Sequence, residues 1–175
     1  DHTIRLWNVA DPAHAAPLGP ALTGPTNAVG GVAFSPDGRV LAAASFDGTI
    51  RLWNVADAAR PAPLGVPLTD HGSGAIDVAF SPDGHTLAST GHDGMIRLWS
   101  MADPAHPVAL GALPPTQASP VGSVAFSRDG HILAVASAGN VELIDVTDPA
   151  RATTVGLGLM GNDGAINSVA FSRDG

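Results

Sequence analysis

Short apolar stretches alternate along the whole chain with turns built from Gly, Pro, Asp and Ser. No helical period of useful length appears, and the stretches are rich in β-branched residues, so the pattern predicts β-strands joined by tight turns. In residues 25–70, Pro36 sets the backbone at the first corner of one turn, and Gly38 supplies the positive φ that closes it. The expected elements of this unit are strands at 28–34, 40–45, 49–55 and 62–68, turns at 35–38 and 47–48, and a connector at 56–61.

The fourth strand of the unit carries prolines in two copies, Pro17 and Pro20 in one and Pro63 and Pro67 in the other. Proline has no N–H group to donate to a neighbouring strand, so it belongs on the edge of a sheet. The fourth strand is therefore expected to be the outermost one. Its prolines also protect that edge from pairing with other chains.

The same order of elements recurs at a nearly constant interval. Strands that end in Phe followed by Ser-Xaa-Asp-Gly occur with steps of 46, 46 and 45 residues, at Phe34, Phe80, Phe126 and Phe171. The segment Ile-Arg-Leu-Trp also recurs in steps of 46 residues, at 4–7, 50–53 and 96–99. Repeats of this length are typical of modular arrays. Four antiparallel strands with apolar faces describe the blade of a β-propeller.

The repeated unit resembles the WD repeat. The family pattern combines a Gly-His pair, a strand ending in Phe-Ser-Pro-Asp-Gly, an Asp-Gly turn and a strand ending in Trp-Asp. The resemblance covers the whole chain, and it implies a buried hydrogen-bonded set of His, Ser or Thr, the turn Asp and Trp in each blade. The residues expected to form such sets are Ser45, Asp47 and Trp53 in one unit and His71, Asp93 and Trp99 in the next.

No unit contains all four residues of the set at the expected positions. The His position holds Pro25, His71, Gln117 and Asn162, and the Ser position holds Ser45, Gly91 and Ser137. The third unit keeps only Ser137, and residues 138–145 replace its Asp-Gly turn and its Trp with one residue fewer. A turn of different shape and a weaker hydrogen-bond network are expected there.

The predicted fold is all-β, a segment of a propeller made of four-stranded antiparallel blades. The expected units are a partial blade at 1–24 with third and fourth strands, blades at 25–70 and 71–116, a degenerate blade at 117–161, and a lone first strand at 162–175. Both ends fall inside predicted hairpins. We therefore expect an open arc, cut from a longer protein whose neighbouring repeats complete a ring. Seven blades are common among the proteins that it resembles.

Composition narrows the possible functions. The chain has 175 residues, a net charge of −8, eight basic residues that are all arginine, and no cysteine. Disulfides and thiolate metal sites are therefore excluded, and an acidic chain without basic clusters argues against nucleic acid and anionic membrane as partners. The absence of lysine and the abundance of Ala, Gly and Pro suggest a bacterial source. No membrane span or signal peptide is visible, and a cytoplasmic location is expected.

Neither a catalytic nor a metal site is expected, and no cofactor. The histidines occupy corresponding points on different blades, as His85 and His131 do, so they do not converge. Glu142 is the only glutamate, and the serines recur in the turns of every unit. The alternative is a propeller-based hydrolase or lyase, whose active site lies or is completed outside this segment.

The positions that break the repeat are the candidate binding residues. On the face that carries the Asp-Gly turns, these positions hold Phe46, His92, Asn27 and Gln117. A constant frame with variable loops is how scaffolds encode their partners, although drift in solvent is an equal alternative. In resembling proteins this face is the common docking surface. The resemblance therefore implies a non-catalytic scaffold for a protein or peptide, within a larger bacterial signalling or regulatory protein.

Overall fold

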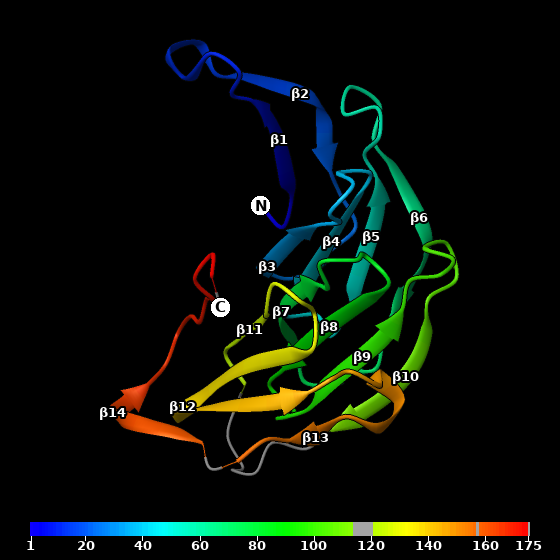
Figure 1. Ribbon diagram of the computed structural model, residues 1–175. Helices are drawn as coiled ribbons and strands as arrows, with labels where there is room; N and C mark the ends of the chain where they lie inside the picture. Colours follow the sequence, from blue (N-terminus) through cyan, green and yellow to red (C-terminus); the bar gives the residue numbers. More distant parts are fainter. Residues whose placement is uncertain (114–120, 157, 175) are drawn as a thin grey trace.

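The structure is a computed structural model that describes residues 1–113, 121–156 and 158–174. Two complete four-stranded antiparallel sheets form its centre, and we call them blade 1 and blade 2 (Figure 1). Blade 1 has the strand order β3 (Val29–Phe34), β4 (Val40–Ser45), β5 (Ile50–Asn54) and β6 (Ala62–Leu68). Blade 2 has the order β7 (Ala75–Phe80), β8 (Thr86–Gly91), β9 (Ile96–Ser100) and β10 (Val108–Leu113).

The predicted edge position of the proline-bearing strand is confirmed, because β6 lies at the outer end of its sheet. The N-terminal hairpin consists of the matching third and fourth strands, β1 (Ile4–Asn8) and β2 (Ala16–Leu22). Trp7 pairs with Pro17 there, as Trp53 pairs with Pro63 in blade 1. The Ser-Xaa-Asp-Gly turns at 35–38, 81–84 and 127–130 close as expected, and Gly38 has a φ of 71°.

Asp followed by Pro begins a short helical turn in two of the connectors. These turns are the 3-10 helices η1 (Pro12–His14) and η2 (Pro149–Arg151). The Asp11 side chain accepts a hydrogen bond of 3.1 Å from the Ala13 N–H group, and Asp148 does the same for Ala150. Each aspartate therefore caps the first turn, as its side-chain chemistry favours.

Blade 3 contains β11 (Ser123–Phe126), β12 (Ile132–Asp145), β13 (Thr153–Thr154) and β14 (Leu159–Ala165). Figure 1 shows that β12 folds back on itself, so that it supplies both the second and the third strand. Its ends meet because the Val146 N–H group donates to the His131 carbonyl at 2.8 Å, the bond that Val55 makes to Arg39 in blade 1. The bend includes Gly139, whose φ is 75°. Removing one residue has thus tightened this turn without removing the hairpin.

The fourth strand of blade 3 is split, and the chain after it differs from the expectation. β13 pairs with Ile144 and Asp145, and β14 pairs with Val141, Asn140 and Ala138 of the same hairpin. The lone first strand expected within 162–175 does not form, because β14 ends at Ala165 and residues 166–174 contain no strand. A first strand is held by hydrogen bonds to a second strand, and the described residues offer it no such partner.

The blades pack face to face through apolar side chains. Blades 1 and 2 share a core that includes Leu52, Val78, Leu87 and Trp99, and a second core joins blades 2 and 3. The resulting arc is open, as predicted, with both chain ends on its open side (Figure 1). Phe34 on β3 is 55% exposed, whereas the matching Phe80 is partly buried against the blade 1–2 core. In the part of the chain that the structure describes, no helix has the length and apolar character to cross a membrane.

Candidate functional site

A buried chain of hydrogen bonds links four side chains in blade 2. The Trp99 indole N–H group donates to the Ser89 hydroxyl at 3.0 Å, and Ser89 lies 2.9 Å from His71 Nε2. His71 Nδ1 lies 3.0 Å from Asp93 Oδ1. His71 and Ser89 are fully buried, and Trp99 is 4% exposed. The structure thus brings together the three residues expected in this unit.

One set of protons satisfies every member of this chain. If Ser89 donates to Nε2 of a neutral His71, the Nδ1–H group donates to Asp93, and Ser89 still accepts from Trp99. Arg97 Nη1 also lies 2.8 Å from Nδ1, and in this tautomer it donates to Asp93 Oδ2 at 2.7 Å and not to the ring. Burial lowers the pKa of His71 against the raising effect of Asp93, and the charge of Arg97 lowers it further. A neutral imidazole is therefore favoured. Burial raises the pKa of Asp93, but hydrogen bonds from His71, the Met95 N–H group and Arg97 outweigh it, so the net pKa lies below the ordinary value.

Ser89 was not among the expected residues, because the Ser position was assigned to residue 91. Residues 89 and 91 lie on the same face of β8, since side chains alternate along a strand. A Cβ atom at Gly91 would collide with His71 Nδ1 and lie 2.8 Å from Asp93 Oδ1. Glycine therefore makes room for the imidazole, and the hydroxyl is supplied one pleat earlier. A serine two residues before the glycine was the signal available in the sequence.

Blade 1 holds its Asp-Gly turn by different contacts. Asp47 accepts hydrogen bonds from the Thr26 N–H group at 2.7 Å and from the Thr49 N–H group at 2.9 Å, and both threonine hydroxyls donate to it as well. Burial raises the pKa of Asp47, but these bonds outweigh it and lower the pKa to about 2. The Ser45 hydroxyl lies 3.4 Å from the Asn27 carbonyl and accepts from the Asp47 N–H group at 3.2 Å. Trp53 is buried among Leu6, Leu41 and Ala43 instead of bonding to Ser45.

In blade 3 only part of the expected set lies within the described residues. The Ser137 hydroxyl lies 3.4 Å from the Asn140 carbonyl, inside the tightened hairpin. Gln117 lies outside the described residues, and so does the side chain of Asn162.

Asp77 is a second residue that the sequence did not single out. Its carboxylate bridges blades, because Oδ2 accepts from the Val124 N–H group of β11 at 3.1 Å, while Oδ1 accepts from the Val78 N–H group at 2.9 Å. On the other side a Cβ atom at Gly31 would collide with Asp77. Burial raises the pKa of this carboxyl. Its role is to join neighbouring inner strands, which the repeat pattern cannot indicate.

The residues of the Asp-Gly turn face meet across the boundary between blades 1 and 2. The rings of Phe46 and His92 lie edge to face, with 5.3 Å between centroids and an interplanar angle of 62°. Phe46 remains 38% exposed, and His92 is exposed. The Asn27 side chain accepts from the Ala28 N–H group at 2.8 Å, so it also shapes its own loop. This face therefore presents an aromatic pair held by two blades.

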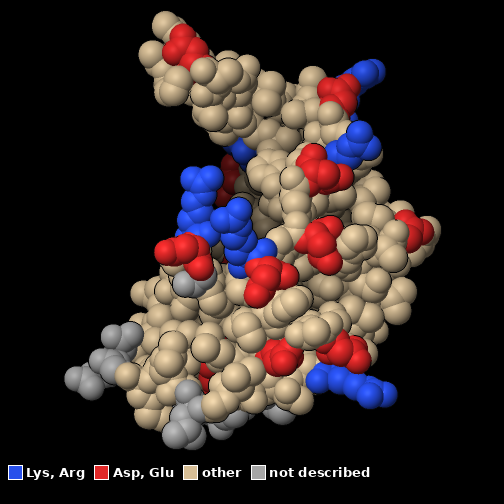
Figure 2. Space-filling view, in the orientation of Figure 1, with Lys and Arg blue, Asp and Glu red and all other residues tan. Residues whose placement is uncertain are grey.

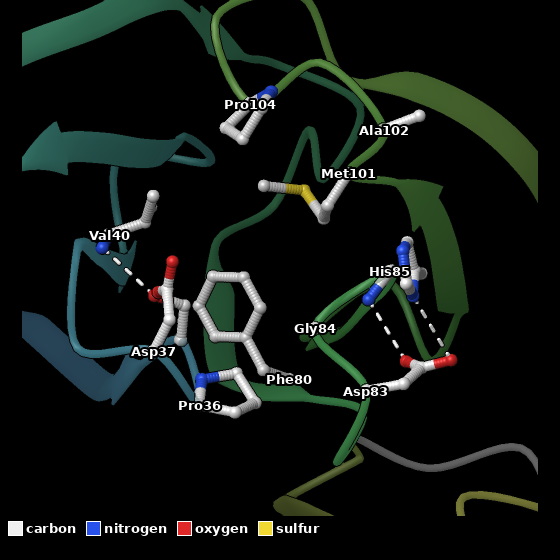
Figure 3. Close-up of a pocket in the computed structure, with 11 residues that line it drawn as sticks. Pro36, Asp37, Val40, Phe80, Asp83, Gly84, His85, Met101, Ala102 and Pro104 are labelled. Atoms are coloured by element: carbon white, nitrogen blue, oxygen red, sulfur yellow. Dashed lines mark hydrogen bonds and ion pairs between the residues drawn. The ribbon is translucent and has the colours of Figure 1, made fainter.

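Two similar cavities, each of about 320 Å³, lie on the opposite face between neighbouring blades. In the first, Phe80 and Met101 project between Asp37 on one side and Asp83 with His85 on the other (Figure 3). The Ser35 hydroxyl donates to Asp37 at 2.6 Å, so this carboxylate serves the turn. Phe126, Asp129 and His131 occupy the matching places in the second cavity. Because the same cavity recurs in successive repeats, we attribute it to the packing of the blades and not to a unique binding site.

Charged side chains are spread over the part of the chain that the structure describes. In the view of Figure 2, acidic side chains lie along the whole arc, and basic ones lie both near its open side and on its outer edge. Several histidines pair locally, as His106 does with Asp103 at 2.8 Å. Among the described residues no three His, Asp or Glu side chains gather as metal ligands would.

Four-stranded blades packed face to face, each with a Ser-Xaa-Asp-Gly turn on one face and blades 1 and 2 with a turn aspartate on the other, define an open segment of a β-propeller. The family of the WD domain, G-beta repeat, matches this chain at residues 18–54, 62–100 and 111–145. These segments cover more than half of the chain, which therefore belongs to the WD-repeat family. Comparison with curated proteins gives no significant match. WD repeats generally act as scaffolds that bind proteins or peptides, and they are typically non-catalytic.

Proposed function

We propose that this chain is the docking region of a larger bacterial signalling or regulatory protein in the cytoplasm, and that it binds a protein or peptide on the Asp-Gly turn face. The observation that carries the proposal is the Phe46–His92 pair, which is exposed and is fixed by two blades at once. Exposed aromatic residues that become buried on docking are frequent hot spots of binding. The net charge of −8 disfavours nucleic acid and anionic membrane as the partner.

A second surface, which is apolar and exposed, suits contact with neighbouring repeats of the same parent chain. Val32 and Phe34 on β3 are 50% and 55% exposed. At the next blade the matching Phe80 lies in the cavity beside Ser35 and Pro36 of the preceding blade's turn. We therefore expect another blade to cover Phe34 in the same way.

The test of the docking face uses Phe46→Ala in the full parent protein. A photo-crosslinking residue placed at position 92 should capture the partner covalently and so identify it. Titration of that partner against the protein without the crosslinker then gives the affinity. Phe46→Ala should weaken that affinity about tenfold or more, because an aromatic hot spot contributes at least roughly 1–2 kcal/mol. The free energy of unfolding should change little, since Phe46 is partly exposed.

The matched control is Val66→Ala, which removes an apolar side chain that is 79% exposed on the outer strand β6. It should leave the affinity unchanged. Equal affinities for the wild type and Phe46→Ala would show that the partner binds elsewhere.

A further inference from the structure

Three arginines occupy the same place in the repeated Ile-Arg-Leu-Trp segment, and one of them lacks a carboxylate. Arg5 contacts Asp1 at 3.3 Å, and Arg97 contacts Asp93 at 2.7 Å. In both pairs the acid stands four residues before the arginine. The Arg51 side chain makes neither a hydrogen bond nor an ion pair with any residue that the structure describes, and its buried Nε atom has no partner.

The reason lies in the carboxylate that Arg51 would be expected to use. Asp47 stands four residues before Arg51, but it already accepts four hydrogen bonds from Thr26 and Thr49. A carboxylate offers about four lone-pair sites, so Asp47 is fully occupied. The substitution of Pro25 and Thr26 for the His-containing loop of blade 2 has therefore released the arginine from its internal partner.

Arg51 lies in a groove between blade 1 and the N-terminal hairpin. The groove is lined by Thr23 at the end of the hairpin and by Trp53, Pro63 and Pro67 of blade 1, and it has a volume of about 60 Å³. The guanidinium lies against the backbone of Gly24, because a Cβ atom there would come within 2.9 Å of Nη1. A single water needs only about 10–15 Å³ of such space, so the groove has room for a larger polar group.

An unpaired guanidinium that is half-buried is costly, because the buried N–H group has lost its water without gaining an acceptor. The Nε–H and Nη–H groups of arginine form a planar fork that matches two oxygens of a carboxylate or a phosphate. We propose that this groove is an oxyanion-binding site, in which Arg51 donates through Nε and one Nη atom to a carboxylate or phosphate group. The site goes beyond docking on the turn face and does not depend on it.

The site can be tested by NMR on the arginine Nε–H signals of the full chain, with inorganic phosphate and the amide of N-acetylglutamate as separate probes. Sodium chloride at equal ionic strength corrects for general screening of surface charges. With at least one probe, the Arg51 signal should follow a saturating curve and move at least about threefold further than that of Arg60, an exposed arginine already paired with Asp57. Saturation by phosphate alone identifies a phosphate-bearing ligand, and saturation by the glutamate derivative alone identifies an acidic side chain.

A pair of variants provides an independent readout. Arg51→Gln should abolish the saturating shifts of the Thr23 and Gly24 amides, whereas Arg60→Gln should retain them. The wild-type titration stands on its own if Arg51→Gln fails to fold. Parallel, non-saturating shifts of all arginines, or no response of Arg51 to either probe, would overturn the proposal and leave water as the occupant of the groove.

Discussion

Blades 1 and 2 have the same strand order and the same third-strand segment, yet they hold the same turn with different chemistry. In blade 2 the turn residue Asp93 faces a buried histidine, and the chain of hydrogen bonds continues through Ser89 to Trp99. In blade 1 the turn residue Asp47 faces the Thr26 backbone and hydroxyl, and Trp53 is held by apolar packing.

Three positions change together between these two blades. Blade 2 has His71, Ser89 and Gly91, and blade 1 has Pro25, Ala43 and Ser45 at the matching places. The imidazole needs a hydroxyl at one position and empty space at the other, so losing it removes the need for both. The comparison teaches that blades 1 and 2 share a turn aspartate whose hydrogen bonds are satisfied, and that the side chains satisfying it differ as a group between them.

Among changes to this group of residues, a substitution at Gly91 is expected to cause the largest loss of stability. Gly91→Ser introduces the residue of blade 1 where a Cβ atom would collide with His71, and overpacking of this kind should cost about 3 kcal/mol. In a His71→Ala background the cost should fall by about 1 kcal/mol or more, since the colliding ring is gone. Denaturant unfolding of the double-mutant cycle measures both values. The same cost in both backgrounds would show that the two positions are independent.

Removing the turn acid of blade 2 should have the next largest effect. Asp93→Ala leaves buried His71 without its acceptor and Arg97 without its ion pair, so it should lower the free energy of unfolding by about 1–3 kcal/mol. Asp129→Ala is the matched control, because Asp129 caps an exposed hairpin turn, and its cost should be smaller. Equal denaturant midpoints for the two variants would refute a network around Asp93.

A smaller effect should appear as a dependence of stability on pH. The pKa of His71 is lower in the folded protein than its ordinary value of 6.5, so the unfolded chain binds this proton more readily. The stability that His71 contributes is therefore fully present above pH 6.5 and declines as the pH falls below it, by at most about 1.4 kcal/mol per pH unit.

The measurement is the free energy of unfolding at about pH 7.5 and about pH 5.5. His71→Ala should lose less stability between these values than the wild type. The control is His85→Ala, in which the lost imidazole is 74% exposed, and it should behave like the wild type. A wild type that gains stability on acidification relative to His71→Ala would reverse the direction assigned to this pKa.

Many of the strands and turns could be predicted from the sequence, because each repeated residue favours its local structure for a physical reason of its own. The prolines indicated the edge position of β6, and Gly38 indicated the positive φ of its turn. What could not be predicted depends on contacts between segments. The first strand expected within 162–175 fails because its partner strand is missing from the described residues, and the split of β13 from β14 has no signal in the local pattern.

The contacts of the candidate site also divide into those that the sequence predicted and those that it did not. The pairing of His71 with Asp93 could be anticipated from the family pattern. The role of Ser89 was missed, because residues 89 and 91 share one face of β8, and the serine beside Gly91 became a signal only once the volume of the imidazole was known. The occupation of Asp47 by Thr26, which leaves Arg51 unpaired, depends on the path of the loop after Pro25.

The exchange of side chains between the two blades is tested most directly by comparing Ser89→Ala with Ser45→Ala in denaturant unfolding. Ser89→Ala strands His71 Nε2 and the Trp99 N–H group, so it should cost about 1–3 kcal/mol. Ser45→Ala removes only contacts of 3.2 and 3.4 Å, and its cost should be less than half as large. Equal costs, or a larger cost for Ser45→Ala, would contradict the assignment of Ser89 as the hydroxyl that completes the buried chain of blade 2.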